Sequence, residues 1–259
     1  MQKVRPKKFL GQHFLTDMDI ARQITEAMVF TDDENCVLEI GPGMGVLTNF
    51  LFSRKGIRLK LIEIDRESVE YLKKNFPSLI DDIVSGDFLH TDLSSIFGRP
   101  FSIIGNFPYN ISSQILFRAI ENRDLVLSLV GMFQKEVAMR ICSPPGKKDY
   151  GILSVFVQAF FHAEYLFTVD EHVFHPPPKV KSGVIRLTRK KDYSLGADEK
   201  HFFRVVKTAF NQRRKTMRNS LKPLLTESVK PDMSILSRRP EELGFQEFVE
   251  LTNLLFPPD

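Results

Sequence analysis

Short apolar runs that alternate with helical patterns constrain this chain to an α/β fold. The first four runs each end in a turn of glycine or polar residues, and helical patterns start near Val46 and Ile111. Such alternation is typical of parallel strands joined by helices. Open α/β sheets bind ligands outside the carboxyl ends of their strands, so the residues after each run are the first candidates for a site. The expected strands are 36–40, 59–64, 83–84, 101–104, 125–133, 164–169 and 183–187.

The fourth run ends at Gly105 and leads into Asn106, Phe107, Pro108 and Tyr109. The amino group of a nucleobase is a poor nucleophile until acceptors hold its two N–H groups, because its lone pair is delocalised into the ring. The side-chain oxygen of Asn106 is one such acceptor. The second is the backbone carbonyl of Phe107 or Pro108, where the proline ring fixes the chain direction. Tyr109 offers a ring on which a base can stack. An ordinary turn is the alternative for this tetrapeptide.

Three glycines, Gly41, Gly43 and Gly45, lie between the first run and the helix that starts near Val46. Glycine lets a backbone turn sharply and approach a ligand closely, and a helix N-terminus offers unpaired N–H groups to an anion. The spacing differs from the Gly-x-Gly-x-x-Gly of dinucleotide-binding proteins, so the glycines alone are a weak signal.

Acidic residues follow the second and third runs. Glu63 lies 22 residues beyond Gly41, where a carboxylate can accept hydrogen bonds from both ribose hydroxyls of a nucleoside, and Asp65 is its competitor. Asp87 can accept from an adenine amino group while Phe88 forms a wall, although an aspartate after a strand is also a common turn residue. Three consecutive strand ends with such side chains favour a nucleoside pocket.

Positive charge is concentrated in one part of the chain. Residues 172–222 hold 14 Lys or Arg and three acidic residues, a net +11, so the remainder carries −7 within the total of +4. A localised basic region is the footprint expected for a polyanion such as nucleic acid. Residues 201–222 hold seven basic residues and no acidic one, and they follow helical spacing beside an apolar stripe. A solvated face would mix the two signs.

The chain divides into segments of different character. Residues 1–15 form a basic arm, and 173–180 form an extended loop that three prolines stiffen. The charged segment 189–199 has the composition of a linker, so we place a domain boundary near residue 190. It separates a sheet domain, 1–190, from a helical domain, 191–259.

Length and composition bound the remaining possibilities. A chain of 259 residues can bury one sizeable core and carry a smaller appendage. Its two cysteines, Cys36 and Cys142, argue against a disulfide framework and for a reducing compartment. Neither a membrane span nor a signal peptide is recognisable, so we expect a cytoplasmic protein without a membrane partner. The sequence shows no cluster of metal ligands, and no metal is expected.

Six motifs occur in a fixed order along the chain. They are Gly-Gln-His-Phe-Leu at 11–15, Glu-Ile-Gly-Pro-Gly-Met-Gly at 39–45, Asn-Phe-Pro-Tyr-Asn at 106–110, Phe-His-Pro-Pro-Pro-Lys-Val at 174–180, Phe-Asn-Gln-Arg-Arg-Lys at 210–215 and Arg-Pro-Glu-Glu-Leu at 239–243. Together, from about Lys7 to Leu251, they resemble the ribosomal RNA adenine dimethylases, in particular the type that acts on the small ribosomal subunit.

The resemblance implies a Rossmann-like methyltransferase that uses S-adenosylmethionine (SAM), with a mostly parallel seven-stranded sheet and a small all-α C-terminal domain. The implied reaction is N6,N6-dimethylation of two adjacent adenosines in a hairpin near the 3′ end of small-subunit (16S) ribosomal RNA, linked to biogenesis of that subunit. The methyl group passes directly from the sulfonium to a base that has left its stack. The small subunit is then the partner, and we expect the protein to be a monomer.

Site residues are carried over position by position. The implied SAM contacts are Gln12, His13, Leu15, Gly41, Gly43, Gly45, Glu63, Asp87 and Asn106. The implied catalytic residues are Asn106, Pro108, Tyr109 and Phe174. The basic residues expected to bind RNA are Lys179, Lys181, Arg204, Lys207, Arg213, Arg214, Lys215, Arg218 and Lys222.

Two positions depart from the family pattern, and one aromatic residue has two possible roles. His13 stands where the family often has Asn, so its cofactor contact is expected through the backbone. Phe107 stands where Leu or Ile is usual, which predicts a bulkier pocket wall. We expect Phe174 and Tyr109 to stack on the extruded adenine; the alternative for Phe174 is packing in the core.

Three rival functions remain open from the sequence. The large-subunit RNA adenine dimethylases that confer antibiotic resistance share the N-terminal motifs, although the segments 210–215 and 239–243 favour the small-subunit type. A non-catalytic nucleic-acid-binding factor for ribosome assembly or transcription has no need of both a base pocket and a cofactor pocket. DNA adenine methylation lacks a recognisable sequence-reading domain.

Overall fold

The computed structural model describes residues 4–30, 35–225 and 233–257. Backbone contacts divide the chain into two compact units. The sheet unit comprises Met1–Ala138 and Glu164–Arg189, and the helical unit comprises Met139–Ala163 and Lys190–Asp259. The expected division near residue 190 differs from these units in one segment, 139–163. That segment contains a helix that is buried on nearly all sides and packs against two helices of the helical unit.

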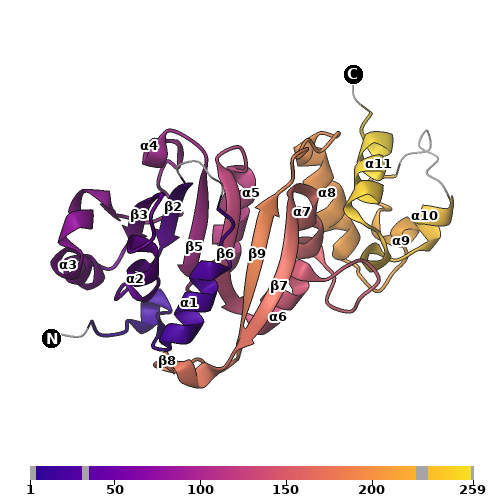
Figure 1. Ribbon diagram of the computed structural model, residues 1–259. Helices are drawn as coiled ribbons and strands as arrows, with labels where there is room; N and C mark the ends of the chain where they lie inside the picture. Colours follow the sequence, from indigo (N-terminus) through magenta and orange to yellow (C-terminus); the bar gives the residue numbers. More distant parts are fainter. Residues whose placement is uncertain (1–3, 31–34, 226–232, 258–259) are drawn as a thin grey trace. The chain divides into compact units, whose positions relative to one another are not determined.

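The sheet is mixed and mostly parallel, as predicted (Figure 1). Within the described residues, seven strands follow the order β4-β3-β2-β5-β6-β9-β7, and β1 pairs with β8 in a separate two-stranded sheet. The strands from β2 to β6 pair in parallel, and β9 runs antiparallel to β6. The strands are β1 Phe14–Leu15, β2 Asn35–Ile40, β3 Ile57–Glu63, β4 Ile83–Ser85, β5 Phe101–Asn106, β6 Val126–Gln134, β7 Phe161–Val169, β8 Phe174–His175 and β9 Ser182–Arg189.

Local sequence signals set where several helices begin. The Asp17 carboxylate accepts from the backbone N–H groups of Asp19 and Ile20 and so caps α1, and Asp65 caps α3 through Glu67 N. The α-helices are α1 Met18–Glu26, α2 Val46–Phe52, α3 Arg66–Asn75, α4 Ser94–Phe97, α5 Ser112–Glu121, α6 Lys135–Cys142, α7 Ile152–Phe160, α8 Glu199–Phe210, α9 Met217–Ser220, α10 Met233–Ser237 and α11 Phe245–Leu255. Short 3₁₀ helices are η1 Lys8–Leu10, η2 Pro77–Asp82, η3 Glu171–Val173 and η4 Pro240–Glu242.

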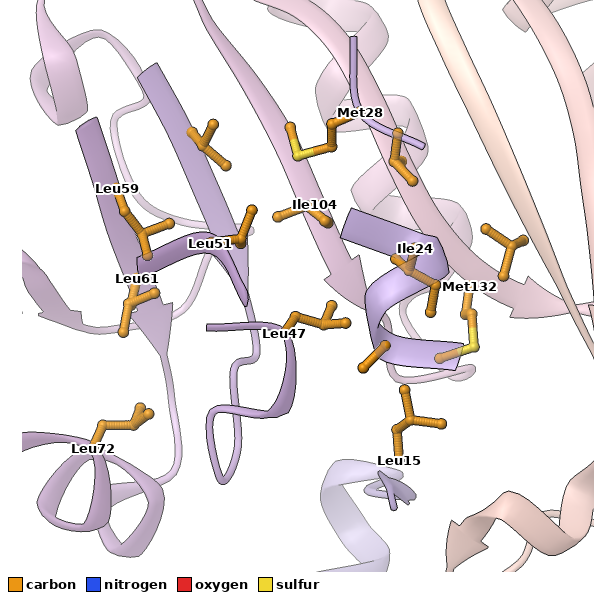
Figure 2. Packing of buried hydrophobic residues seen from close by; sticks show 14 of the residues in the cluster. Leu15, Ile24, Met28, Leu47, Leu51, Leu59, Leu61, Leu72, Ile104 and Met132 are labelled. Atoms are coloured by element: carbon orange, nitrogen blue, oxygen red, sulfur yellow. The ribbon is translucent and has the colours of Figure 1, made fainter. Parts of the chain in front are cut away.

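The core of the sheet unit lies between the sheet and the helices α1 and α2 (Figure 2). Ile24 of α1 and Leu47 and Leu51 of α2 belong to the same buried cluster as Ile104 of β5 and Met132 of β6. Each of these side chains is at most 3% exposed. Close packing of this kind fixes the ends of β2, β3 and β5 relative to one another, and those ends carry the candidate site residues.

The basic segment of the helical unit differs from its predicted form. The sequence predicts one helical face from residue 201 to 222, but α8 ends at Phe210 and α9 begins only at Met217. Distant backbone atoms determine this break, because Met217 N donates to Arg238 O and Arg213 donates to Lys148 O. The cations beyond Phe210 therefore do not continue the face of α8.

Among the described residues, no helix is both long enough and apolar enough to cross a bilayer.

Candidate active site

A cavity of about 280 Å³ lies at the carboxyl ends of β2, β3 and β5. Its walls come from the N-terminal segment around η1, the glycine turn after β2, the end of β3, the turn after β4 and the segment after β5. This is the position that the order of strands and turns predicts for a ligand in an open α/β sheet.

The turn after β2 brings bare backbone to the cavity. Gly41 and Gly43 adopt the left-handed conformation, with φ of 64° and 57°. A Cβ at Gly41 would meet no atom within 4 Å, so a ligand can approach this backbone closely. A Cβ at Gly43 would lie 2.8 Å from the ring of Phe14, so a larger residue does not fit there. Gly45 caps α2 at φ 76°.

Glu63 and Asp65 occupy different environments at the end of β3. Glu63 lines the cavity, is 4% exposed, and accepts from Gly43 N at 3.0 Å and from Asp65 N at 2.9 Å. Burial raises the pKa of its carboxyl, and the two backbone hydrogen bonds oppose that shift. The Asp65 carboxylate instead caps α3, accepts from Ser68 at 3.1 Å and binds Lys7. Since Asp65 is engaged in holding the fold, the geometry favours Glu63 as the ligand acceptor.

Asp87 lies in the turn after β4 and lines the same cavity. Its Oδ1 accepts from Leu89 N at 2.9 Å, and its Oδ2 lies 2.9 Å from His90 Nδ1. The adjacent Phe88 ring is buried and forms part of the wall. The turn-forming role and the lining role of Asp87 are therefore both present in the structure.

The amide of Asn106 is held in one orientation. Its Nδ2 donates to the backbone carbonyl of His13 at 2.8 Å, which leaves Oδ1 as the acceptor for a substrate N–H. The Pro108 carbonyl already accepts from Ile111 N at 3.1 Å. Of the two carbonyls that the sequence offers as the second acceptor, the geometry favours the one at Phe107.

His13 connects three segments around the cavity. Its carbonyl accepts from Asn106, its Nδ1–H donates to the Pro176 carbonyl at 2.7 Å, and its ring stacks on Tyr109 with centroids 5.7 Å apart. The Tyr109 hydroxyl forms a short hydrogen bond with the Ser182 hydroxyl. The side chain of His13 is thus engaged with protein groups, which favours a backbone contact to a cofactor. Sequence reasoning missed Pro176 and Ser182, because no local pattern marks either as a partner of this turn.

Phe107 is seated between strands in addition to lining the cavity. Its ring is 1% exposed and lies where Gly105 and Gly131 have no side chains. A Cβ at Gly131 would fall 2.2 Å from a ring carbon. The ring of Phe133 packs edge-on against it at 5.4 Å. Part of the Phe107 ring is therefore accommodated within the sheet, in the space left by Gly131 of β6. No local pattern in the sequence marks Gly131 as the partner of Phe107.

The position of Phe174 differs from the expected one. The residue pairs with Leu15 in the short β1–β8 sheet, its ring is 4% exposed, and it belongs to the buried cluster with Val169 and Val184. It is not among the described residues that line the cavity. A ring packed in this way is not available to stack on a base, so the structure favours the alternative, core packing. The exposed neighbour His175 lies on the opposite side of the strand.

The residues expected to bind RNA are distributed over both units. In the sheet unit, Lys179 is exposed and Lys181 pairs with Asp170. In the helical unit, Arg213 donates to the Lys148 carbonyl and lies 3.9 Å from Glu241, so it contributes to the fold. The other predicted RNA-binding residues of the helical unit are all exposed: Arg204, Lys207, Arg214, Lys215, Arg218 and Lys222.

Comparison with known proteins decides which family has this arrangement. Residues 3–238 match the family model described as ribosomal RNA adenine dimethylase. The chain belongs to the ribosomal RNA adenine dimethylase family. The dimethylase is 58% identical over 254 residues to the ribosomal RNA small subunit methyltransferase A of Flavobacterium johnsoniae, an alignment that covers 97% of this chain and 96% of that one.

Two solved structures share the fold of the dimethylase. A dimethyladenosine transferase from Plasmodium falciparum superposes with a TM-score of 0.78 at 25% identity and covers 92% of this chain and 96% of that one. The 23S ribosomal RNA methyltransferase ErmE superposes with a TM-score of 0.71, also at 25% identity, and covers 93% of this chain and 99% of that one. The predicted Rossmann-like methyltransferase fold is confirmed.

The dimethylase is an enzyme that methylates ribosomal RNA and uses SAM as the methyl donor. The cavity suits this cofactor because a buried carboxylate, Glu63, lies beside open backbone at Gly41. A nucleoside offers hydroxyl groups to the carboxylate, and the turn at Gly41, which has no side chain, leaves room for the substituent that extends from the ribose.

Proposed function

We propose that the dimethylase converts two adjacent adenosines, in a hairpin near the 3′ end of small-subunit ribosomal RNA, to N6,N6-dimethyladenosine during biogenesis of that subunit. The observation that carries the proposal is the 58% identity over nearly the whole chain to a protein named for small-subunit RNA. The motifs at 210–215 and 239–243 give independent support from the sequence. We further propose that the protein acts in the cytoplasm as a monomer.

We assign the cavity to SAM, which when bound supplies an activated methyl group on its sulfonium. Glu63 accepts from the ribose hydroxyls, and Asp87 accepts from the adenine amino group. Gly41 leaves the backbone open to the rest of the cofactor, and Gly43 also lines the cavity. Gly45, which is also a predicted contact, is not among the described residues that line the cavity, and a Cβ there would lie 2.5 Å from the ring of Phe76. Gln12 and His13 belong to the wall that the N-terminal segment provides, with the His13 contact made through its backbone. Leu15, which is also a predicted contact, is 3% exposed in the core and is not among the described residues that line this cavity.

The target base is held at the end of β5. Asn106 Oδ1 and the Phe107 carbonyl accept the two N–H groups of the adenine, which directs the nitrogen lone pair toward the methyl group. Pro108 fixes the direction of the chain at this point, and Tyr109 stacks on the ring. Most of the rate enhancement then comes from positioning, because the methyl donor is already activated. The same acceptors hold the monomethylated base through its remaining N–H during the second transfer.

The experiment that tests the proposal offers the enzyme two RNA substrates. Purified protein and labelled SAM are incubated with unmodified small subunits and, separately, with unmodified large subunits, and the modified nucleotides are mapped. We expect two adjacent dimethyladenosines near the 3′ end of the small-subunit RNA. Label in the large subunit alone would support the activity named for ErmE instead. Absence of label from both would contradict the proposal.

A further inference from the structure

The N-terminal segment 7–12 forms a compact turn that serves as one wall of the cavity. Leu10 N donates to Lys7 O at 3.1 Å, and the Gln12 side-chain oxygen accepts from Lys7 N at 2.9 Å. These bonds hold the segment together as one compact turn. From Phe9 to His13 every residue of the segment lines the cavity. The Phe9 ring is nevertheless 77% exposed, so burial of this ring contributes little to holding the turn in place.

Lys7 joins the turn to carboxylates just after β3. Lys7 Nζ contacts Asp65 Oδ1 directly, and Glu67 Oε1 lies 3.4 Å away. Gln12 Nε2 lies 3.5 Å from the other oxygen of Asp65. The Asp65 side chain is only 1% exposed and that of Lys7 is 25% exposed, so water screens this pair less than a surface pair.

Asp65 also contacts Glu63, the proposed cofactor acceptor. The backbone N–H of Asp65 donates to Glu63 Oε1, and the other oxygen of Glu63 accepts from Gly43 N. A cation on this turn is therefore attached two residues from the carboxylate that is assigned to the ribose. Release of Lys7 from Asp65 would free the turn at the place where it meets the cofactor.

We propose that Lys7 and Asp65 form a latch that holds the turn 7–12 closed over the cavity and sets how fast SAM enters and S-adenosylhomocysteine leaves. The proposal rests on the assignment of the cavity to SAM. Lys7 is a positioning residue here, since it contacts neither the substrate nor the cofactor. Each methyl transfer leaves S-adenosylhomocysteine to be replaced by SAM, so opening of the latch is required once for every methyl group added.

A purely structural role for the ion pair predicts a different result. If Lys7 only supports the cap of α3, its loss lowers stability and leaves cofactor exchange unchanged in the folded protein. A latch predicts faster exchange and a more accessible turn at temperatures where the fold is intact. The adjacent Lys8 provides a matched control, because it lies in the same turn and its side chain is exposed.

The test compares Lys7→Met, which keeps the aliphatic stem, with Lys7→Arg and with the control Lys8→Met. Release of bound S-adenosylhomocysteine is measured by chase with excess unlabelled ligand. We expect about tenfold faster release in Lys7→Met, because a charge-assisted hydrogen bond is lost, and release within about twofold of the wild type in the other two. Chymotrypsin cleavage after Phe9 should accelerate in Lys7→Met alone.

A second measurement compares the salt response of the wild type with that of Lys7→Met. Raising the salt concentration should speed release from the wild type and have less effect on Lys7→Met, because salt weakens a charge pair that is partly open to solvent. Equal release rates for Lys7→Met and Lys8→Met, or equal salt responses, would overturn the latch.

One further variant separates this proposal from the assignment of the cavity. Glu63→Gln should weaken the affinity for S-adenosylhomocysteine measured by calorimetry. Weakened affinity in Glu63→Gln together with unchanged release in Lys7→Met would refute the latch and leave the cavity assigned to SAM. Unchanged affinity in Glu63→Gln would refute the assignment of the cavity, and the latch with it.

Discussion

The sheet unit and the helical unit carry their functional charges in opposite surroundings. In the sheet unit, the carboxyl groups of Glu63 and Asp65 are buried at the end of β3, and each accepts hydrogen bonds from fixed protein groups. In the helical unit, cations such as Lys207 and Arg214 are exposed on α8 and on the segment after it. A buried charge must be satisfied by partners in set positions, whereas an exposed charge is solvated and can adapt.

Because of this difference, substitutions in the two units should change different measured quantities. Changes at the strand ends should alter stability, catalysis or proton binding, with little response to salt. Changes to the exposed cations should alter the salt dependence of RNA binding and leave stability almost unchanged. Four variants test the division.

Phe174→Ala should have the largest effect and should appear as lost stability. Removal of a ring that is 4% exposed in the core costs about 3–5 kcal/mol, because a cavity is left behind. Chemical denaturation measures the loss, and the control is His175→Ala, an exposed neighbour in the same strand. A normal melting temperature with a strongly reduced methylation rate would instead restore the stacking role that the sequence predicts.

Asn106→Ala should abolish most of the chemistry and little of the RNA binding. The side-chain oxygen of Asn106 polarises the substrate amine, and loss of one such preorganised group typically costs about 10²–10³-fold in rate, or about 3–4 kcal/mol. Single-turnover methylation with saturating SAM measures the rate, and filter binding measures RNA affinity. A wild-type rate in this variant would contradict the assigned role.

Glu39→Gln should remove a pH dependence of stability that belongs to the sheet unit. Burial, and secondarily the charge of Glu63, raise the pKa of Glu39 to about 8 from its ordinary 4.5, against the hydrogen bond that Thr48 donates. Between these two values the folded state binds the proton and the unfolded chain has released it, so stability falls as pH rises.

The wild type should therefore lose stability, on the order of 2–4 kcal/mol, between about pH 5 and pH 8, and Glu39→Gln should lose much less. The glutamine keeps an oxygen that can accept from Thr48 and removes the ionisable group. Urea unfolding at a series of pH values, each at low and at high salt, makes the measurement. Parallel curves for the two proteins would show that Glu39 does not titrate in this range.

The strand-end site could be predicted from the sequence because its signals are local. The glycine turn after β2 and the turn after β5 are each defined by adjacent residues, and the mostly parallel sheet follows from alternation of strands with helices. Even the choice of Glu63 over Asp65 had a local basis in the distance from Gly41. What remained hidden are contacts between distant segments, such as Asn106 with the His13 carbonyl.

The errors have the same physical origin. An aromatic residue beside three prolines gives no indication of which side of the chain it faces, and only the pairing of β8 with β1 turns Phe174 into the core. The sequence from 211 to 216 has no proline or glycine to end a helix, yet α8 stops at Phe210; beyond it the Arg213 side chain donates to the Lys148 carbonyl and Met217 N donates to the Arg238 carbonyl. Here tertiary contacts override helical periodicity.

The smallest effect per residue is expected on the basic surface of the helical unit, and it tests the other half of the comparison. Replacing Lys207, Arg214 and Lys222 together with Gln should lower the slope of log affinity against log salt by about two to three, since each lost phosphate contact contributes about one. Each exposed cation should affect folding stability by less than about 1 kcal/mol.

The control replaces Lys55 and Lys74, exposed lysines of the sheet unit, and keeps a similar change in net charge. A filter-binding series over salt concentration measures the slopes. If the control changes the slope as much as the triple variant does, binding depends on net charge alone. An unchanged slope in both would mean that these cations form a solvated face that makes no phosphate contacts.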